Sequence, residues 1–560
     1  MDDAMPCFSQ FLAAVLTATL GISCTVPALA QVRLDRADPS ITEQALPRAV
    51  HPGEATAAIP TVETPTPRIG AADGPTGVVA AITVGGRTQL PSSAFAAALT
   101  DYVGRQLGRD DLARLAGAVA GVARGNGYPF ASASIEAQPM RNGVLRVTLD
   151  DGRVDAVRVI GATNPAADRL LTRALVTGRG VRRAELERAI LLVGDIAGVR
   201  VKDSRYTRQD GFGILLVTIV QDRGSAYVQL DNRGSREVGP VRSTMLASLR
   251  GLAGSGDELS LIAAQTPFDP SEFAFVRGRY AAPVGADGAV LSASASYGRS
   301  HPGASLAVLD VIGKSVDLAA AYARPLVRSR ARSLWGTLEF RAIQIRQTLS
   351  GLLLRDDRLA TLTGSLNGAT ALGGGILRGE TSITGGLPLS GVSHEGDARI
   401  SRRDGDARFA TIGYTVEWVL TLARPITLVL GSSGQLASRP VLATAEIGAG
   451  GPAFGRGYDY AERTGDNGIL GSVELRGDLG RVAPGAIERA QVYAFVDGGH
   501  VSNWRHGIGG GSLLSSGAGV RAGLFARLDG MIEIALPLNA DRFDTRNRRP
   551  RLSVRLSRSF

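Results

Sequence analysis

The side chains that most often carry out catalysis or hold metals are few and scattered in this sequence. The chain of 560 residues has two cysteines, Cys7 and Cys24, and both lie in an apolar N-terminal segment. The five histidines show no spacing typical of metal ligands or of a His-based triad: His51, His301, His394, His500 and His506. If the N-terminal segment is removed, the mature chain has no cysteine. A disulfide scaffold, a cysteine-ligated zinc site and a thiol nucleophile are then excluded. We therefore expect no catalytic residue, no metal site, no cofactor and no enzyme activity.

A short glycine pattern, Gly455-Arg456-Gly457, could suggest a phosphate-binding loop. It lacks a third glycine at the required spacing, and no β-α-β pattern surrounds it, so a nucleotide site is excluded. From these residues alone, Arg456 is best interpreted as a solvated loop cation, because arginine is abundant in this chain.

The charge balance is positive but carries little information about partners. The chain has 62 Lys+Arg against 52 Asp+Glu, a formal net charge of +10, and nearly all the cations are arginine. No run of basic residues and no basic stripe interleaved with aromatics is present, so we expect no nucleic-acid partner. The 71 glycines and the 5% aromatic content favour a fold with many strands and turns.

The N-terminus predicts export. Residues 11–30 form an apolar stretch that ends in Ala-Leu-Ala, a small-x-small cleavage signal, so residues 1–30 are predicted to be a signal peptide although Asp2 and Asp3 replace the usual basic residues. Residues 31–48 are weakly compatible with a helix, and residues 49–77 are rich in Pro, Thr, Ala and Gly, which predicts a flexible linker. No later stretch reaches the ~18 apolar residues of a spanning helix.

Residues 78–151 and 152–222 show the same order of expected elements, β-α-α-β-β. In the first unit we expect strands at 78–84, 130–138 and 144–149, with helices at 92–103 and 109–124. In the second we expect strands at 154–160, 199–206 and 213–220, with helices at 165–176 and 182–196. One larger α+β domain is the alternative, but the repeated order favours two small domains.

Residues 223–560 carry strand patterns without helices. The clearest runs from Phe409 to Leu422, where apolar and polar side chains alternate over a length typical of a membrane-spanning strand rather than of an average soluble one. Glu417 would face a wet lumen, and the chain ends on Phe560, on the apolar face of its last alternating segment. Units of roughly 21 residues predict a transmembrane antiparallel β-barrel of about sixteen strands. A soluble sandwich or propeller is the alternative.

Several strings in this order resemble the TpsB transporters of two-partner secretion, the haemolysin secretion/activation proteins within the superfamily of BamA-like barrels. They are GYPFASASIEAQPMRNGVLRVTLDDGRV (127–154), LERAILLVGDIAGVRV (186–201), LDNRGSREVGPVR (230–242), GSGDELSL (254–261) and YARPLVRSR (322–330). The resemblance implies a signal peptide, two α+β POTRA domains and a C-terminal outer-membrane barrel, with residues 31–48 at the position of the family's plug helix. It places the barrel in the outer membrane of a Gram-negative bacterium and the POTRA domains in the periplasm.

Two motifs resemble paired signatures of that superfamily. The loop motif comprises Phe454, Gly455, Arg456, Gly457 and Tyr458, and the inner-wall motif comprises Phe495, Asp497 and Gly499. By analogy, the sixth extracellular loop folds into the barrel and Arg456 reaches Asp497, a pairing that suits a guanidinium and a carboxylate. Strand alternation independently assigns Tyr493, Phe495 and Asp497 to the lumen side.

Two further charges, Glu474 and Arg476, lie opposite the apolar Val473 and Leu475. They could join the charge network of the lumen, but the simpler interpretation is that they line the pore without a special role.

The resemblance implies a transporter that binds an unfolded TpsA-type exoprotein through its POTRA domains and secretes it through the barrel. The other expected partners are outer-membrane lipids and, during biogenesis, periplasmic chaperones and the barrel-assembly machinery. The alternative function is that of a barrel assembly factor, or insertase, of the same superfamily. Such factors usually carry more POTRA units than the two expected here. A passive porin would lack POTRA units.

Overall fold

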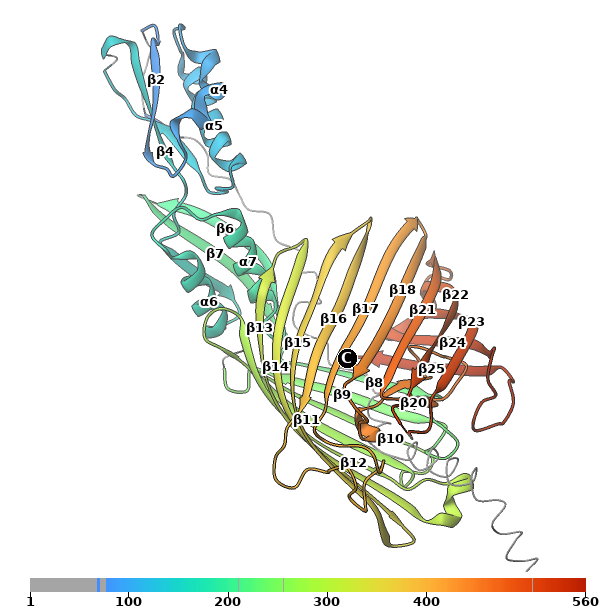
Figure 1. The fold of residues 1–560 in the computed structure, drawn as a ribbon. Coiled ribbons are helices and arrows are strands. Elements are labelled where there is room, and N and C mark those ends of the chain that lie inside the picture. Colours follow the sequence, from blue (N-terminus) through green and yellow to red (C-terminus); the bar gives the residue numbers. More distant parts are fainter. Residues whose placement is uncertain (1–67, 71–76, 140, 210, 255, 506) are drawn as a thin grey trace, which may run out of the picture.

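The computed structural model describes residues 68–70, 77–139, 141–209, 211–254, 256–505 and 507–560. The predicted signal peptide (1–30), the predicted plug helix (31–48) and nearly all of the predicted linker (49–77) lie outside the described residues. Figure 1 shows an arm of two α+β units beside a large barrel, with the first unit farther from the barrel than the second.

The first unit, POTRA1, is a four-stranded sheet in the order β1-β3-β4-β2 covered by helices. Its elements are β1 (Arg68–Ile69), β2 (Ala81–Arg87), η1 (Ser92–Phe95), α4 (Ala96–Leu99), η2 (Thr100–Tyr102), α5 (Arg109–Gly125), β3 (Ser132–Ile135), η3 (Arg141–Gly143) and β4 (Val144–Asp150). Helix α5 buries residues at helical spacing, among them Leu112, Leu115, Ala116 and Val119, so one face packs on the sheet.

One helix of POTRA1 departs from the prediction. Residues 92–103 were expected to form one helix, but the structure has one α-helical turn between two 3-10 turns. The hydroxyl of Thr100 donates a hydrogen bond to the Ala96 carbonyl at 3.0 Å, a local bond that competes with regular helix. Short 3-10 turns at both ends complete the segment.

The second unit, POTRA2, repeats the arrangement with a three-stranded sheet in the order β5-β7-β6. Its elements are β5 (Ala156–Gly161), α6 (Pro165–Leu175), α7 (Arg183–Gly194), β6 (Val199–Gln209) and β7 (Phe212–Gln221). Asn164 caps α6, because its side chain accepts a hydrogen bond from the Ala167 amide at 3.0 Å, and Pro165 occupies the first helical turn. In both units the strand before the helices (β2 or β5) runs parallel to the last strand (β4 or β7), and the strand after the helices (β3 or β6) runs antiparallel to it.

The two units share part of one core. Phe130 of POTRA1 is fully buried in the hydrophobic cluster of POTRA2 and stacks on Tyr206, with ring centroids 4.2 Å apart. Arg208 of POTRA2 also donates a hydrogen bond to Asp150 of POTRA1 at 2.6 Å. POTRA1 and POTRA2 are therefore held together by side-chain packing as well as by the covalent connection between them.

Sixteen of the described strands close into an antiparallel barrel in which β25 pairs with β8. They are β8 (Gly224–Asp231), β9 (Arg242–Arg250), β10 (Glu258–Gln265), β11 (Phe273–Val284), β12 (Ala289–Ser300), β13 (Val311–Arg328), β14 (Arg332–Leu349), β15 (Leu352–Leu372), β16 (Gly375–Gly386), β17 (Ala410–Ala423), β18 (Ile426–Ala437), β21 (Asn467–Gly480), β22 (Ile487–Ser502), β23 (Gly511–Leu524), β24 (Leu528–Pro537) and β25 (Arg551–Ser559). The predicted fold class, with its barrel of about sixteen strands, is confirmed.

The alternation of each strand separates an apolar outer face from a polar inner one. On β13, Val316 and Leu318 are exposed on the outside, whereas Ser315 and Asp317 are buried on the inside. Asp317 forms ion pairs with Arg341 on the neighbouring strand β14 and with Arg277 on β11, two strands away. A period of two therefore sends charge to the lumen and aliphatic side chains to the surroundings.

POTRA2 is attached to one end of the barrel through the C-terminal part of α7 and the last residues of β13. Arg328 donates two hydrogen bonds to Asp195, at 2.7 and 2.8 Å, and both side chains are buried. Arg188 donates to the Pro325 carbonyl at 3.0 Å. These contacts fix the arm beside the end of the barrel at which β8 begins.

Two short strands, β19 (Ile447–Ala449) and β20 (Arg463–Gly465), pair with each other outside the barrel sheet. Small 3-10 turns also occur in the barrel region, η4 (Ala304–Leu309), η5 (Ala443–Ala445) and η6 (Phe525–Arg527). None of the helices in the described part of the chain combines the length and the apolar composition needed to cross a membrane.

Candidate functional site

The connection between β18 and β21, residues 438–466, folds back against the barrel wall. Counted from the β8–β9 connection, it is the sixth connection at the end of the barrel opposite POTRA2, and we call it loop 6. Its hairpin β19–β20 packs against β21, β22 and β23. The loop motif predicted from the sequence lies between these two strands.

Glycines shape the tip of loop 6. The Gly450 amide donates to the Phe454 carbonyl at 2.9 Å, and the Tyr458 amide donates to the Gly455 carbonyl at 2.9 Å. Gly455 has φ +88°, and a Cβ there would lie 3.1 Å from the Gly450 Cα. A side chain at 455 would therefore be strained and crowded, which explains the glycine before Arg456.

Arg456 projects from this tip into a cluster of three carboxylates on three strands. Its Nη1 lies 2.5 Å from Glu474 Oε2 on β21 and 3.4 Å from Glu533 Oε2 on β24, and its Nε lies 3.0 Å from Asp497 Oδ2 on β22. The guanidinium carbon lies 3.9 Å from the centroid of the Phe495 ring, a cation–π contact. A single planar group thus contacts the wall through charge and through stacking.

The loop backbone also binds the wall. The Arg456 amide donates to Asp497 Oδ1 at 3.1 Å, and the Gly457 amide donates to the Ser515 hydroxyl at 3.2 Å. Ser515 in turn donates to Asp497. A Cβ at 457 would lie 3.0 Å from the Pro537 nitrogen, so Gly457 permits the close approach of loop and wall.

The remaining motif residues pack around these contacts. Tyr458 is fully buried, and its hydroxyl lies 3.1 Å from Asn539 Oδ1 and from the Ala540 carbonyl, both in the connection between β24 and β25. Phe454 is partly buried against the cluster around Tyr458. A Cβ at Gly499 would lie 2.4 Å from Leu470 Cδ2, so this glycine allows β22 to pack closely on β21.

The structure thus brings together all the residues of the two predicted motifs and adds others. Glu474, which the simpler sequence interpretation left without a special role, makes the shortest contact with Arg456. Glu533 was not singled out in the sequence, and it also binds Arg233 and the Tyr493 hydroxyl. Its inward position on an alternating strand was the one signal that could have marked it.

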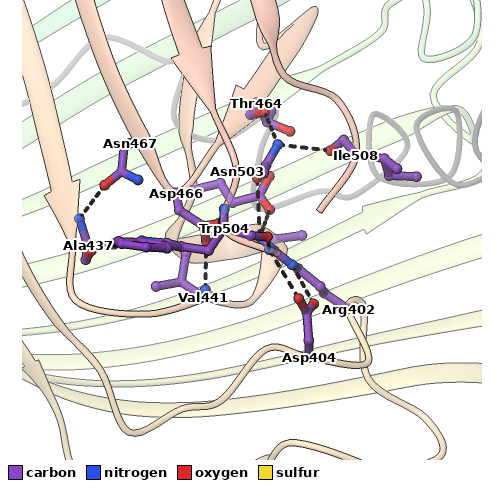
Figure 2. A network of polar contacts seen from close by, with 12 residues as sticks. Arg402, Asp404, Ala437, Val441, Thr464, Asp466, Asn467, Asn503, Trp504 and Ile508 are labelled. Atoms are coloured by element: carbon purple, nitrogen blue, oxygen red, sulfur yellow. Dashed lines mark hydrogen bonds and ion pairs between the residues drawn. The ribbon is translucent and has the colours of Figure 1, made fainter. Parts of the chain in front are cut away.

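The base of loop 6 is held by a second polar cluster, shown in Figure 2. Arg402, in the connection between β16 and β17 (loop 5, residues 387–409), donates to Asp404 and Asp466, both at 2.7 Å, and to the Trp504 carbonyl at 2.5 Å. Asp466, at the end of loop 6, is fully buried and also accepts hydrogen bonds from the amides of Val441 and Trp504, at 2.7 Å each. Trp504 lies in loop 7 (503–510), so one guanidinium joins three loops at the mouth of the barrel.

This arrangement is suited to positioning rather than to bond-making chemistry. Both clusters consist of arginine and carboxylate side chains, whose pairing fixes geometry. Among the described residues, no group of three or more His, Cys, Asp or Glu side chains is placed to hold a metal ion. The tip of loop 6 is bound to the wall by one cluster, and its base is bound to loops 5 and 7 by the other.

Comparisons with known proteins agree with this architecture. The family model described as "Haemolysin secretion/activation protein ShlB/FhaC/HecB" matches residues 214–522, and the model described as "POTRA domain, ShlB-type" matches residues 78–152. Among characterised relatives, the heme/hemopexin transporter protein HuxB of Haemophilus influenzae (strain 86-028NP) is 22% identical over 415 residues, covering 72% of this chain and 73% of HuxB.

Two solved structures share the fold. CdiB from Escherichia coli is 18% identical with a TM-score of 0.68, and the match covers 93% of this chain and 95% of that one. CdiB from Acinetobacter baumannii is 17% identical with a TM-score of 0.61, and the match covers 96% and 98% of the two chains. At these identities the likeness concerns the fold alone.

Proposed function

The chain belongs to the haemolysin secretion/activation family ShlB/FhaC/HecB, the outer-membrane transporters of two-partner secretion, and on that premise we propose that it binds one dedicated exoprotein. The unfolded exoprotein first contacts the periplasmic POTRA arm. It then passes through the barrel lumen as an extended chain and folds outside the cell. Outer-membrane lipids surround the apolar outer face of the barrel.

The observation that carries this proposal is the polar, charged interior of a closed barrel whose entrance is joined to the POTRA arm. Arg277 and Arg341 flank Asp317 on the inner wall, and Arg378 lies 3.9 Å from Glu417 across the β16–β17 pair. Arg378 and Glu417 are both nearly half exposed, so this stretch of wall is hydrated. A hydrated wall of mixed charge suits the passage of an unfolded polypeptide, whose backbone needs hydrogen-bond partners throughout.

Within this function, Arg456 positions loop 6 in the lumen. Its contacts reach three strands, so loss of the guanidinium would weaken the attachment of the tip while leaving the strand pairing intact. Removing one partner of a buried ion pair costs on the order of 3–5 kcal/mol, and less where water enters. We therefore expect the variants Arg456→Ala and Asp497→Ala to impair secretion more than barrel assembly.

The test is deletion of the gene followed by comparison of the extracellular and outer-membrane proteomes. Complementation uses the wild type, the two variants and Arg505→Ala, an exposed arginine of loop 7 that serves as a matched control. The proposal requires that one or two large proteins disappear from the medium or cell surface and return with the wild type and with Arg505→Ala. Broad depletion of outer-membrane barrels would instead establish an assembly factor, and normal secretion by both site variants would refute the role of Arg456.

A further inference from the structure

A row of basic side chains crosses the outer face of the barrel at the end opposite POTRA2. Arg299 on β12 lies opposite Lys314 on β13, and Lys314 lies opposite Arg346 on β14. All three side chains are exposed. They lie on the outer face because Lys314 has the same strand parity as Val316 and Leu318, which point away from the lumen.

The row lies where the apolar belt of the barrel ends. Below Lys314, the outward positions of β13 from Val316 to Tyr322 are apolar, and the next outward residue is Arg324. The separation of Lys314 and Arg324 matches the ~9–11 residues of a tilted membrane-spanning strand. Arg328, farther along the same strand, binds POTRA2, so Lys314 marks the extracellular boundary of the membrane. The row is therefore level with the lipid headgroups of the outer leaflet.

The protein neutralises only part of this positive charge. Arg346 and Arg358, on the neighbouring strand β15, both bind Asp356, at 3.3 and 2.8 Å. Within the described residues, the side chains of Arg299 and Lys314 form neither an ion pair nor a hydrogen bond. Like charges directly opposite each other on adjacent strands are destabilising. Four cations that share one carboxylate would therefore be stabilised by an anion from outside the protein.

The opposite wall of the barrel differs in character at this end. Ile412 on β17, Leu436 on β18 and Ile469 on β21 are all exposed and apolar. Ile412 and Leu436 are register partners, and Ile469 lies on the next strand. If cations were needed wherever a strand leaves the membrane, these strands would carry them too. The basic row on β12, β13, β14 and β15 is thus a local feature, as expected of a binding site.

We propose that this row binds the phosphate groups of a phosphorylated glycolipid of the outer leaflet. Guanidinium and ammonium groups donate strong, charge-assisted hydrogen bonds to phosphate oxygens. Adjacent strands are ~4.8 Å apart, so the three cations span about 10 Å. That span suits two phosphates at the ends of a sugar disaccharide better than the single phosphate of a common phospholipid. Tyr297 and Val316, which are register partners directly below the row and are both exposed, offer an apolar surface to the acyl chains.

The test measures lipid binding to the purified full-length protein in detergent by native mass spectrometry. The probe is lipid A that carries two phosphates, and phosphate-free lipid A and phosphatidylglycerol are compared with it. The test variant replaces the row: Arg299→Gln/Lys314→Gln/Arg346→Gln. The matched control removes the same charge from exposed arginines near the periplasmic end of the barrel: Arg324→Gln/Arg332→Gln/Arg481→Gln.

We expect the wild type and the control to bind the phosphorylated lipid A at least tenfold more tightly than the test variant. All three proteins should bind phosphate-free lipid A equally weakly, and added salt should narrow the difference because the row is exposed. The faster electrophoretic mobility of the unheated barrel shows that each variant is folded. Lys314→Gln alone, which removes one exposed side chain, should weaken binding about threefold and repeats the test with a smaller perturbation.

Two results would overturn the inference. The first is equal affinity of the wild type and both the triple and the single row variants for phosphorylated lipid A. The second is binding of phosphatidylglycerol by the wild type as tightly as lipid A, which would show that the row recognises any anionic lipid rather than a glycolipid with two phosphates. Neither result would bear on the secretion of the exoprotein, which the proteome comparison tests separately.

Discussion

The attachment of POTRA2 to the barrel should depend on one buried ion pair, Asp195–Arg328. The two side chains are 7% and 4% exposed and are joined by hydrogen bonds of 2.7 and 2.8 Å. The variant Asp195→Ala removes both bonds and leaves the guanidinium without this carboxylate. Truncating one partner of a buried pair costs on the order of 3–5 kcal/mol, which corresponds to a change of about a hundredfold or more in the docking equilibrium.

A matched control is available at the same end of the barrel. Asp287 and Arg324 form an ion pair of 3.1 Å, but their side chains are 41% and 56% exposed. Exposed pairs contribute about 0–1 kcal/mol, so Asp287→Ala should leave docking nearly unchanged. The comparison isolates burial, because both variants replace an aspartate by alanine next to an arginine.

The measurement is the distance distribution between spin labels on Arg173, an exposed residue of α6, and Arg481, an exposed residue of the turn between β21 and β22. In purified full-length protein we expect a narrow distribution for the wild type and Asp287→Ala, and a broad one for Asp195→Ala, with weaker secretion in cells. If Asp195→Ala gave the same distribution and the same secretion as Asp287→Ala, the assignment of the docking contact would be wrong.

The pH dependence of docking should follow from the same residue. Burial raises the pKa of Asp195 above its ordinary value, and Arg328 offsets only part of that effect. The docked state therefore binds a proton more readily than the undocked state, so docking is strongest at low pH and weakens as pH rises through the raised pKa. Asp195→Asn should remove this dependence in the same distance measurement, and should weaken docking less than Asp195→Ala because its amide oxygen still accepts a hydrogen bond.

Three further predictions concern the arm, the wall and the mouth of the barrel. Phe130→Ala should lower the free energy of unfolding of the arm by about 3–5 kcal/mol, since it empties a site in the POTRA2 core, and chemical denaturation of the full chain measures this. Gly498→Ala should prevent barrel folding, because its Cβ would lie 2.1 Å from a main-chain oxygen of β23, and the unheated protein should then lack the faster electrophoretic mobility of a folded barrel. Gly471→Ala, whose Cβ would have its nearest contact at 3.9 Å, should keep that mobility. Arg402→Ala should raise single-channel conductance in planar bilayers by releasing loops 5, 6 and 7, whereas Arg505→Ala, which removes only an exposed pair with Glu395 of loop 5, should leave it unchanged.

The barrel could be predicted from the sequence because one requirement repeats in every strand: apolar side chains must face outward and polar side chains must face the lumen. Alternation with a period of two assigned Asp497 and Phe495 to the lumen side, and the structure places both there, buried against loop 6. What alternation cannot supply is the register between neighbouring strands, which turns and bulges decide. Asp497 faces Ser472 on β21 and Ser515 on β23. The heights of Glu474 and Glu533 along the barrel axis, and so their distances from Arg456, therefore depend on this register.

The loops were less predictable for a related reason. Arg402 has no periodic context, and its partner Asp466 lies 64 positions away in the sequence. Only the fold of loop 5 brings the two together. Residues 92–103 of POTRA1 illustrate the same limit on a smaller scale, because helical spacing indicated a helix but could not show that tight turns would divide it.

The balance of charge around loop 6 explains why an ion pair, rather than apolar packing, holds its tip. Glu474, Asp497 and Glu533 are all buried, and Arg456 is the cation that lies among all three. Arg233 supplies a second positive charge to Glu533. If the tip withdrew, three carboxylates would face one another with one fewer cation, and buried carboxylates without partners are costly.

Withdrawal of loop 6 is therefore opposed unless water or another cation enters the space that Arg456 leaves. The lumen side provides such a route, since Arg476 and Arg521 already bind Glu474 at 2.6 and 3.0 Å and both are partly exposed. A buried ion pair adds little net stability compared with apolar packing, but it is expensive to break and specifies one position. An arrangement of this kind suits a loop that must return to the same place after each polypeptide has passed.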